Sequence, residues 1–181
     1  MIKTALAALA TLSIAAPALA ALAPGAPAPD FDAPAFLAGK QFDFHLDEAL
    51  KKGPVVLYFF PAAHTGGCNL EAHLFAQAAD QFKAQGATLI GITAGNVDQL
   101  AAFSSETEHC SGKFPVAADV GGKIAHDYQS VLALKPDWSD RTSYVIAPDH
   151  KVILAYTAMD PTKHVDQTLN ALEAWRATHP A

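Results

Sequence analysis

The chain has 181 residues, 12 of them basic and 18 acidic, and a net charge of −6. A mildly acidic chain without basic runs lacks the usual signature of proteins that bind nucleic acid or anionic membranes, so we expect neither partner. The length fits one domain with a core of its own. The two cysteines, Cys68 and Cys110, are too few for a disulfide scaffold, which leaves one structural bridge, one redox pair or two unrelated thiols.

Residues 1–20 have the pattern of a secretory signal peptide. A basic start at Lys3 is followed by an apolar stretch over 5–16, the helix breaker Pro17 and a small-residue cleavage pattern that ends at Ala20. The apolar stretch is shorter than the roughly 20 residues that a membrane span needs, so we expect cleavage and no membrane anchor. The sequence therefore predicts a periplasmic or secreted protein, in an oxidising compartment that permits a disulfide.

The remaining chain is predicted to form an extended, proline-rich arm over residues 21–34 and one domain over residues 35–181. Apolar runs rich in β-branched residues predict strands over residues 55–60, 87–93, 143–147 and 152–156. Helical spacing of apolar residues predicts helices over residues 68–85, 97–109, 122–128 and about 161–175. This order indicates an α/β, thioredoxin-like fold with a central mixed β-sheet flanked by helices.

Cys68 stands where a buried strand gives way to a helix. Pro61 ends the first predicted strand and Cys68 begins the next helix, so the cysteine lies at the carboxyl end of a strand, where α/β sheets bind ligands. Unpaired backbone N–H groups and the positive end of the helix dipole favour a thiolate at such a position. Taken singly, a cysteine here is an ordinary buried residue and a threonine before a helix is a cap.

The combination of residues is more specific. Pro61, Thr65 and Cys68 reproduce the Pro-x-x-x-Thr-x-x-Cys signature of peroxiredoxins. The chain resembles most the bacterioferritin-comigratory-protein, or peroxiredoxin Q, branch of this AhpC/TSA superfamily, in which a glutamate follows the cysteine by three residues, as Glu71 does here. Gly66 replaces a proline that is common in this branch, which predicts a more mobile loop. Further likeness runs through residues 26–175 and is carried by three segments, 28–31, 55–60 and 141–146.

The resemblance implies a thioredoxin-dependent peroxidase that reduces hydrogen peroxide and organic hydroperoxides. Cys68 would attack the peroxide and become a sulfenic acid. Thr65 would accept the peroxide O–H and donate to the thiolate, while Arg141 would hold the thiolate and the peroxide together. Pro61 would wall the pocket, and Glu71 would orient the guanidinium of Arg141 through charged hydrogen bonds.

Cys110, near the end of the helix predicted over residues 97–109, is the residue that the resemblance assigns to resolving the sulfenic acid as a disulfide. Bonded cysteines need Cα atoms within about 7 Å, so we expect local unfolding to bring the two together. Two alternatives stay open. The protein could be a one-cysteine peroxidase resolved by an external thiol, or a non-catalytic thioredoxin-fold domain that binds a partner and is stapled by Cys68 and Cys110.

No prosthetic group is implied, and the expected partner is a thioredoxin-like or other thiol reductant. The eight histidines are scattered and no Cys-x-x-Cys occurs, so the sequence predicts no metal site. His64, next to Thr65, is interpreted as a solvated loop histidine. We expect a monomer or weak dimer.

Overall fold

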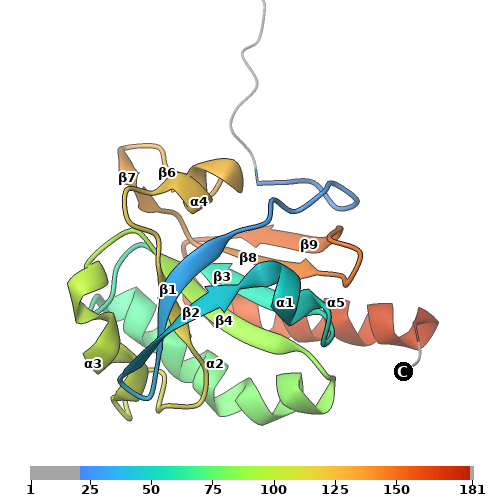
Figure 1. Cartoon of the computed structure of the whole chain (residues 1–181), viewed down its shortest axis with the longest axis horizontal. Coiled ribbons are helices and arrows are strands. Elements are labelled where there is room, and N and C mark those ends of the chain that lie inside the picture. The colour runs from blue at the N-terminus through green and yellow to red at the C-terminus, as the bar shows by residue number, and fades with distance from the viewer. Residues whose placement is uncertain (1–20, 180–181) are drawn as a thin grey trace, which may run out of the picture.

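A computed structural model describes residues 21–179 (Figure 1), and the predicted signal peptide lies outside them. In this described part of the chain, seven strands form one mixed sheet in the order β2-β1-β5-β4-β3-β8-β9, and a short hairpin, β6–β7, stands apart. The strands are β1 Asp32–Leu37, β2 Lys40–His45, β3 Val55–Phe59, β4 Thr88–Thr93, β5 Val116–Ala118, β6 Val131–Leu132, β7 Lys135–Ser139, β8 Thr142–Ile146 and β9 Val152–Thr157.

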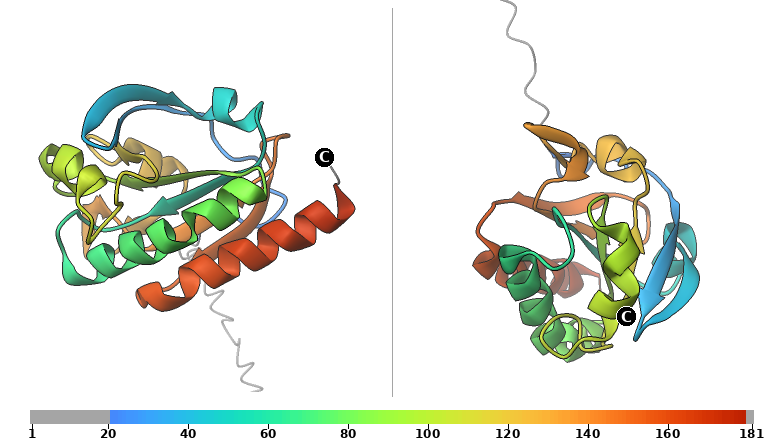
Figure 2. Two further views of the ribbon diagram at one scale, coloured as in Figure 1. Left: turned by 90° about the horizontal axis from the view of Figure 1, so that it is seen from below. Right: turned by 90° about the vertical axis from the view of Figure 1, so that its left-hand side faces the viewer.

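Within residues 21–179, five α-helices and two short 3-10 helices complete the fold. They are α1 Leu46–Leu50, α2 Gly66–Ala84, η1 Val97–Gln99, α3 Leu100–Ser105, α4 Lys123–Asp127, η2 Pro161–Lys163 and α5 His164–Thr178. Helices α2 and α5 pack side by side on one face of the sheet, while the β1–β2 hairpin and α1 lie over the other (Figure 2). The predicted thioredoxin-like fold is confirmed.

The interior strand β3 divides the core into two layers because successive side chains of a strand point to opposite faces. Val55, Leu57 and Phe59 face the cluster that contains α1 and the β1–β2 hairpin. Val56 and Tyr58 face the second cluster, which α2 covers and which contains both cysteines. Strand β3 pairs in parallel with β4 and antiparallel with β8, so it is buried on both sides. The segments that carry Cys68 and Cys110 therefore share one core layer.

All four predicted strands and three of the four predicted helices are present, with ends shifted by at most three residues. The helix predicted over residues 97–109 is wrong in length. It consists of η1 and α3 and stops at Ser105, because Glu106 adopts an extended conformation with φ −65° and ψ 134°. The chain then runs through turns to residue 112.

The predicted arm over residues 21–34 also differs from the structure. Residues 21–31 contain no helix or strand, as expected, but β1 already begins at Asp32 and pairs with both β2 and β5. Strands β2 and β5, helix α1 and the β6–β7 hairpin were not predicted.

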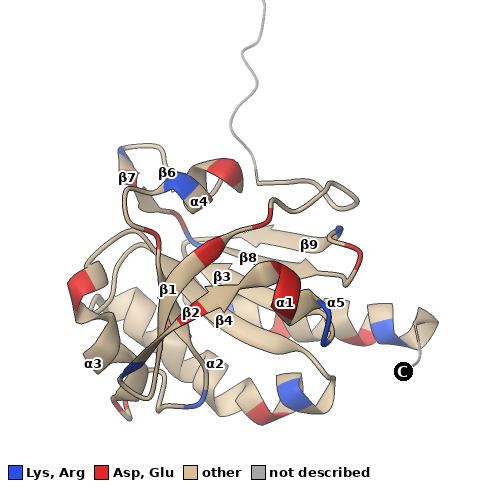
Figure 3. Cartoon of the chain, viewed as in Figure 1, with Lys and Arg blue, Asp and Glu red and all other residues tan. Residues whose placement is uncertain are grey.

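In the view of Figure 3, acidic and basic positions are interspersed over the elements. Among residues 21–179, no helix has the length and apolar character to cross a membrane.

Candidate active site

Cys68 lies in the first turn of α2, at the carboxyl end of β3. Thr65 is the N-cap residue of this helix, with φ −113° and ψ 144°, and Cys68 is the third helical residue. The first N–H groups of a helix have no partner within the helix and carry its positive end. Cys68 is 1% exposed, so this field acts on a sulfur that is shielded from bulk water.

Arg141 approaches the sulfur from the neighbouring strand. Strand β8 pairs with β3 so that Thr142 faces Phe59, which places Arg141 beside the end of β3. Its Nη2 donates to Cys68 Sγ at 3.4 Å, and its Nε donates to the carbonyl oxygen of Met159 at 3.0 Å. A cation fixed in this way stabilises negative charge on the sulfur, and two strands that are adjacent in the sheet position both groups.

The backbone of α2 leaves room for this guanidinium. A Cβ atom at Gly67 would lie 3.1 Å from Nη2 of Arg141. Any larger residue at this position would press on the guanidinium. Gly67 therefore lets the helix start approach Arg141 closely.

Glu71 holds the other side of the guanidinium. It lies one turn after Cys68 on α2, is 0% exposed, and its Oε2 accepts from Nη1 of Arg141. Burial raises the pKa of Glu71 to about 8, and the charge of Arg141 opposes this rise. The structure thus brings Glu71 to the place that the resemblance implies, but burial favours the neutral carboxyl over the carboxylate that was expected.

His164, at the start of α5, is a neighbour of this group that sequence reasoning missed. Its Nδ1 lies 3.5 Å from Oε1 of Glu71 and 2.8 Å from Oγ of Ser143, while Nε2 lies 2.9 Å from the carbonyl oxygen of Ala158. Because a carbonyl only accepts, Nε2 carries the proton, and Nδ1 of the neutral ring accepts from Ser143. Burial lowers the pKa of His164 to about 4. A neutral histidine thus lies against the carboxyl group of Glu71.

Thr65 and Pro61 lie in the loop before α2. The Thr65 hydroxyl donates to the carbonyl oxygen of Ala62 at 3.0 Å. The expectation that Thr65 donates to the thiolate is therefore wrong for this state, but its lone pairs remain able to accept a peroxide O–H. Pro61 is buried at the end of β3, and its carbonyl oxygen accepts from Thr93 Oγ1 at 3.1 Å.

The loop of residues 61–65 is tied to the segment after β4. Asn96 Nδ2 donates to the carbonyl oxygen of Ala63 at 2.9 Å, and Ala62 pairs with Gly95 in an isolated bridge. Gly66 is the first residue of α2 instead of part of this loop. The predicted mobility of this loop, which relied on Gly66, did not take the contacts with Asn96 and Gly95 into account.

Cys110 lies in the turns after α3, not on a helix. It is 0% exposed and belongs to the same core cluster as Cys68, and both are free thiols. Burial raises the pKa of the Cys110 thiol, and the nearby charge of Glu106 raises it further. In this closed arrangement Cys110 is a protonated, enclosed thiol, which is a poor nucleophile.

Comparison with known proteins agrees with this geometry. The family model for the AhpC/TSA family matches residues 24–155, well over half of the chain. Chloroplastic peroxiredoxin Q of Sedum lineare is 31% identical over 125 residues, which are 68% of this chain and 66% of that protein. Chloroplastic peroxiredoxin Q of Suaeda salsa is 32% identical over 143 residues, which are 78% of this chain and 65% of that protein. The matches thus span just under two thirds of these relatives.

A solved structure is similar over nearly its whole length. The crystal structure of peroxidoxin BcpB from Mycobacterium tuberculosis superposes with a TM-score of 0.72 at 31% sequence identity, and covers 83% of this chain and 96% of that one. The fold that positions Cys68 is therefore shared with this protein. The chain belongs to the AhpC/TSA family, as a peroxiredoxin that resembles the peroxiredoxin Q branch.

Proposed function

We propose that the protein is a thiol peroxidase that reduces hydrogen peroxide and small organic hydroperoxides with Cys68. The contact between Arg141 Nη2 and Cys68 Sγ, at 3.4 Å and at the start of α2, is the observation that carries this proposal. It joins a nucleophile, a fixed cation and the positive end of a helix. Such an arrangement serves a reaction in which a thiolate attacks and negative charge develops on a leaving oxygen.

In the proposed reaction the Cys68 thiolate attacks one oxygen of the peroxide. An S–O bond forms as the O–O bond breaks, and the second oxygen leaves with the electron pair and takes up a proton to become water or an alcohol. Cys68 is oxidised to a sulfenic acid and the peroxide is reduced. Arg141 stabilises the thiolate before the attack and the departing oxygen during it, while Thr65 accepts the peroxide O–H.

The second step is resolution by Cys110. Its thiol would condense with the sulfenic acid, forming an S–S bond and releasing water. Because Cys110 is 0% exposed and its burial disfavours the thiolate, the turns after α3 must open first. Local opening of this kind has a lower free-energy cost than global unfolding. If the turns stay closed, an external thiol takes this role and the protein is a one-cysteine peroxidase.

The disulfide would then be reduced by a thioredoxin-like dithiol. We place the protein in the periplasm or outside the cell on the basis of the predicted signal peptide, and as a monomer or weak dimer.

The test is peroxide consumption by the reduced protein, followed with a thioredoxin-like reductant and without it. We expect Cys68→Ser to consume peroxide no faster than buffer, because a hydroxyl is a far weaker nucleophile than a thiolate. Circular dichroism and thermal unfolding of the same sample serve as the control for folding. Peroxide consumption by folded Cys68→Ser at the rate of the unaltered protein would exclude the proposal.

A further inference from the structure

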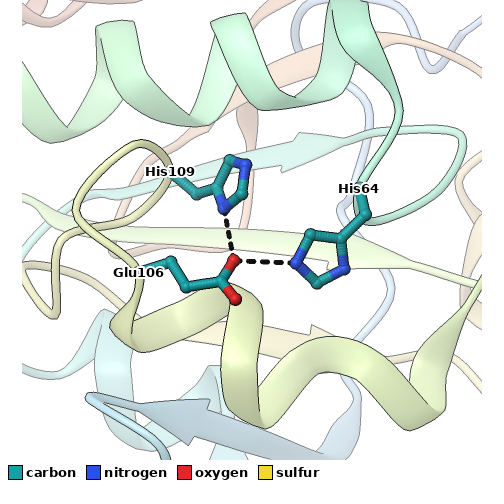
Figure 4. A group of neighbouring side chains, drawn as sticks. All are labelled: His64, Glu106 and His109. Atoms are coloured by element: carbon teal, nitrogen blue, oxygen red, sulfur yellow. Dashed lines mark hydrogen bonds and ion pairs between the residues drawn. The ribbon is translucent and has the colours of Figure 1, made fainter.

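A cluster of His64, Glu106 and His109 lies between the loop before Cys68 and the turns that carry Cys110 (Figure 4). Both rings point at one carboxylate oxygen. His64 Nε2 lies 2.8 Å and His109 Nδ1 lies 2.7 Å from Oε2 of Glu106. His64 is exposed, as the sequence indicated for a loop histidine, and its side chain keeps 30% exposure, but both of its ring nitrogens have a hydrogen-bond partner.

Phe103 orients both imidazole rings. Its ring stacks on His109 with centroids 4.7 Å apart, and meets the edge of His64 at 5.3 Å. The backbone holds Glu106 close to His109, since the N–H of His109 donates to the carbonyl oxygen of Glu106 at 3.1 Å. The three side chains thus converge because the surrounding core holds them, which lowers the cost of organising a ligand site.

The donor set fits a transition metal. Two imidazole nitrogens and one carboxylate make up a common zinc site that leaves a fourth position open. The three ligand atoms lie within 4.8 Å of one another. Ligands of a tetrahedral zinc site with bonds of about 2.0–2.2 Å lie roughly 3.3–3.6 Å apart, so Oε2 of Glu106, now 2.7–2.8 Å from the two ring nitrogens, would need to draw back by about 0.5–0.9 Å. Its side chain is 40% exposed and has room to do so.

The surroundings of His64 support the same conclusion. Metal-binding histidines use their second ring nitrogen to contact an acceptor that fixes the ring. Nδ1 of His64 lies 2.8 Å from Oε1 of Gln99, which leaves Nε2 directed at the cluster. His64 also has a φ of 57°, a left-handed conformation that histidine and asparagine adopt more often than most other non-glycine residues.

We propose that His64, Glu106 and His109 bind a divalent transition-metal ion of the zinc class. The ion replaces the ring protons that now face Oε2, and water completes its coordination. This site goes against the sequence prediction of no metal. That prediction relied on local spacing, whereas these ligands come from two segments that only the fold brings together.

The position of the metal site predicts that a bound ion regulates resolution of the Cys68 sulfenic acid. This regulatory consequence rests on the proposed function. His64 belongs to the loop of residues 61–65, and His109 directly precedes Cys110. A metal ion bonded to both segments holds them together. It therefore opposes the opening that a disulfide between Cys68 and Cys110 requires, and slows resolution of the sulfenic acid.

Metal binding is tested by titrating the reduced protein with Zn²⁺ against a chromophoric chelator. We expect one equivalent to bind, and Co²⁺ to show ligand-field bands without the charge-transfer band of a cobalt–thiolate bond. His64→Asn, Glu106→Gln and His109→Asn should each weaken Zn²⁺ binding at least about a hundred-fold, and Gln99→Leu about ten-fold. Asparagine is chosen for His64 because it tolerates a left-handed backbone.

The matched controls are His126→Asn and Glu108→Gln, which alter an exposed histidine and an exposed glutamate. Both should bind Zn²⁺ as tightly as the unaltered protein. Absence of binding, binding that the three ligand substitutions leave unchanged, or a cobalt–thiolate band would each overturn the proposed site. None of these results depends on peroxidase activity.

The regulatory consequence is tested by the rate of disulfide formation after one equivalent of peroxide, with and without Zn²⁺. We expect Zn²⁺ to slow the reaction at least about ten-fold in the unaltered protein and to have no effect on Glu106→Gln. Equal slowing in both would show that zinc acts on the thiols, and no slowing would show that the loops open with the metal bound. Either result overturns the regulatory consequence. Failure to form a sulfenic acid at Cys68 would instead contradict the proposed function and leave the metal site standing.

Discussion

Arg141 connects the residues around Cys68 into one unit. It donates to Cys68, to Glu71 and to the carbonyl oxygen of Met159, so all three sides of the guanidinium are fixed. The family signature and the glutamate three residues after it predicted Cys68 and Glu71, and the resemblance of residues 141–146 predicted Arg141, but the contact with Met159 was not predicted. His164 could not be predicted, because its contact with Glu71 depends on how α5 packs against α2.

At the residue scale, we expect Glu71 to make stability depend on pH. Burial raises its pKa from 4.5 to about 8, so the folded state keeps a proton there that the unfolded chain releases. The contribution of Glu71 is fully present below pH 4.5 and is lost as the pH rises through 8. Glu71→Gln cannot titrate. The free energy of unfolding of the unaltered protein, minus that of Glu71→Gln, should therefore fall across this range.

Urea unfolding at a series of pH values measures this difference. His164, whose lowered pKa acts in the opposite sense below pH 6.5, is present in both proteins, so its contribution largely cancels. Glu108→Gln is the control for loss of an exposed glutamate and should not reproduce the effect. A difference that stays constant from pH 4.5 to 8 would show that Glu71 is ionised throughout.

At the scale of elements, the junction from β3 to α2 is the structure that positions Cys68. Its strand was predictable because residues 55–59 form one continuous apolar run that is buried on both faces. Strand β2, Lys40–His45, was not predictable in the same way. Its residues are mostly exposed and polar. The strand is stabilised by its pairing with β1, and no run of apolar residues marks it in the sequence. The early end of α3 likewise coincides with contacts of Glu106 to His109, three residues on, and to His64 in a distant segment.

We expect Gly66→Pro to stabilise this junction. Gly66 is the first residue of α2, where proline is favoured because the N–H has no partner within the helix. Thr65 already has the extended conformation that a residue before proline prefers, and a Cβ at Gly66 meets no atom within 4 Å. The free energy of unfolding of the reduced protein should rise by about 0.4–1 kcal/mol, because proline restricts the unfolded chain.

Gly67→Ala serves as the contrast, since its Cβ would lie 3.1 Å from Nη2 of Arg141. It should bring no such gain in urea unfolding experiments. Marked destabilisation by Gly66→Pro would mean that the chain enters α2 in another conformation.

At the scale of the whole molecule, one core layer encloses both cysteines but gives them different chemical environments. Cys68 faces a cation at a helix start, whereas Cys110 lies among apolar side chains that keep its thiol protonated. The overall fold and the attacking cysteine could be predicted from the sequence, because both depend on local patterns and a short signature. The environment of Cys110 and the His64–Glu106–His109 cluster could not, since they arise from tertiary packing.

In the proposed reaction Cys68 takes the peroxide oxygen and Cys110 resolves the sulfenic acid. Intact mass after one equivalent of hydrogen peroxide distinguishes the two roles. We expect the unaltered protein to lose two hydrogens as a disulfide forms. We also expect Cys110→Ser to gain one oxygen, trapped by a sulfenic-acid reagent at Cys68, and Cys68→Ser to stay unchanged. An oxygen on Cys110 of Cys68→Ser, or loss of two hydrogens from Cys110→Ser, would contradict these roles.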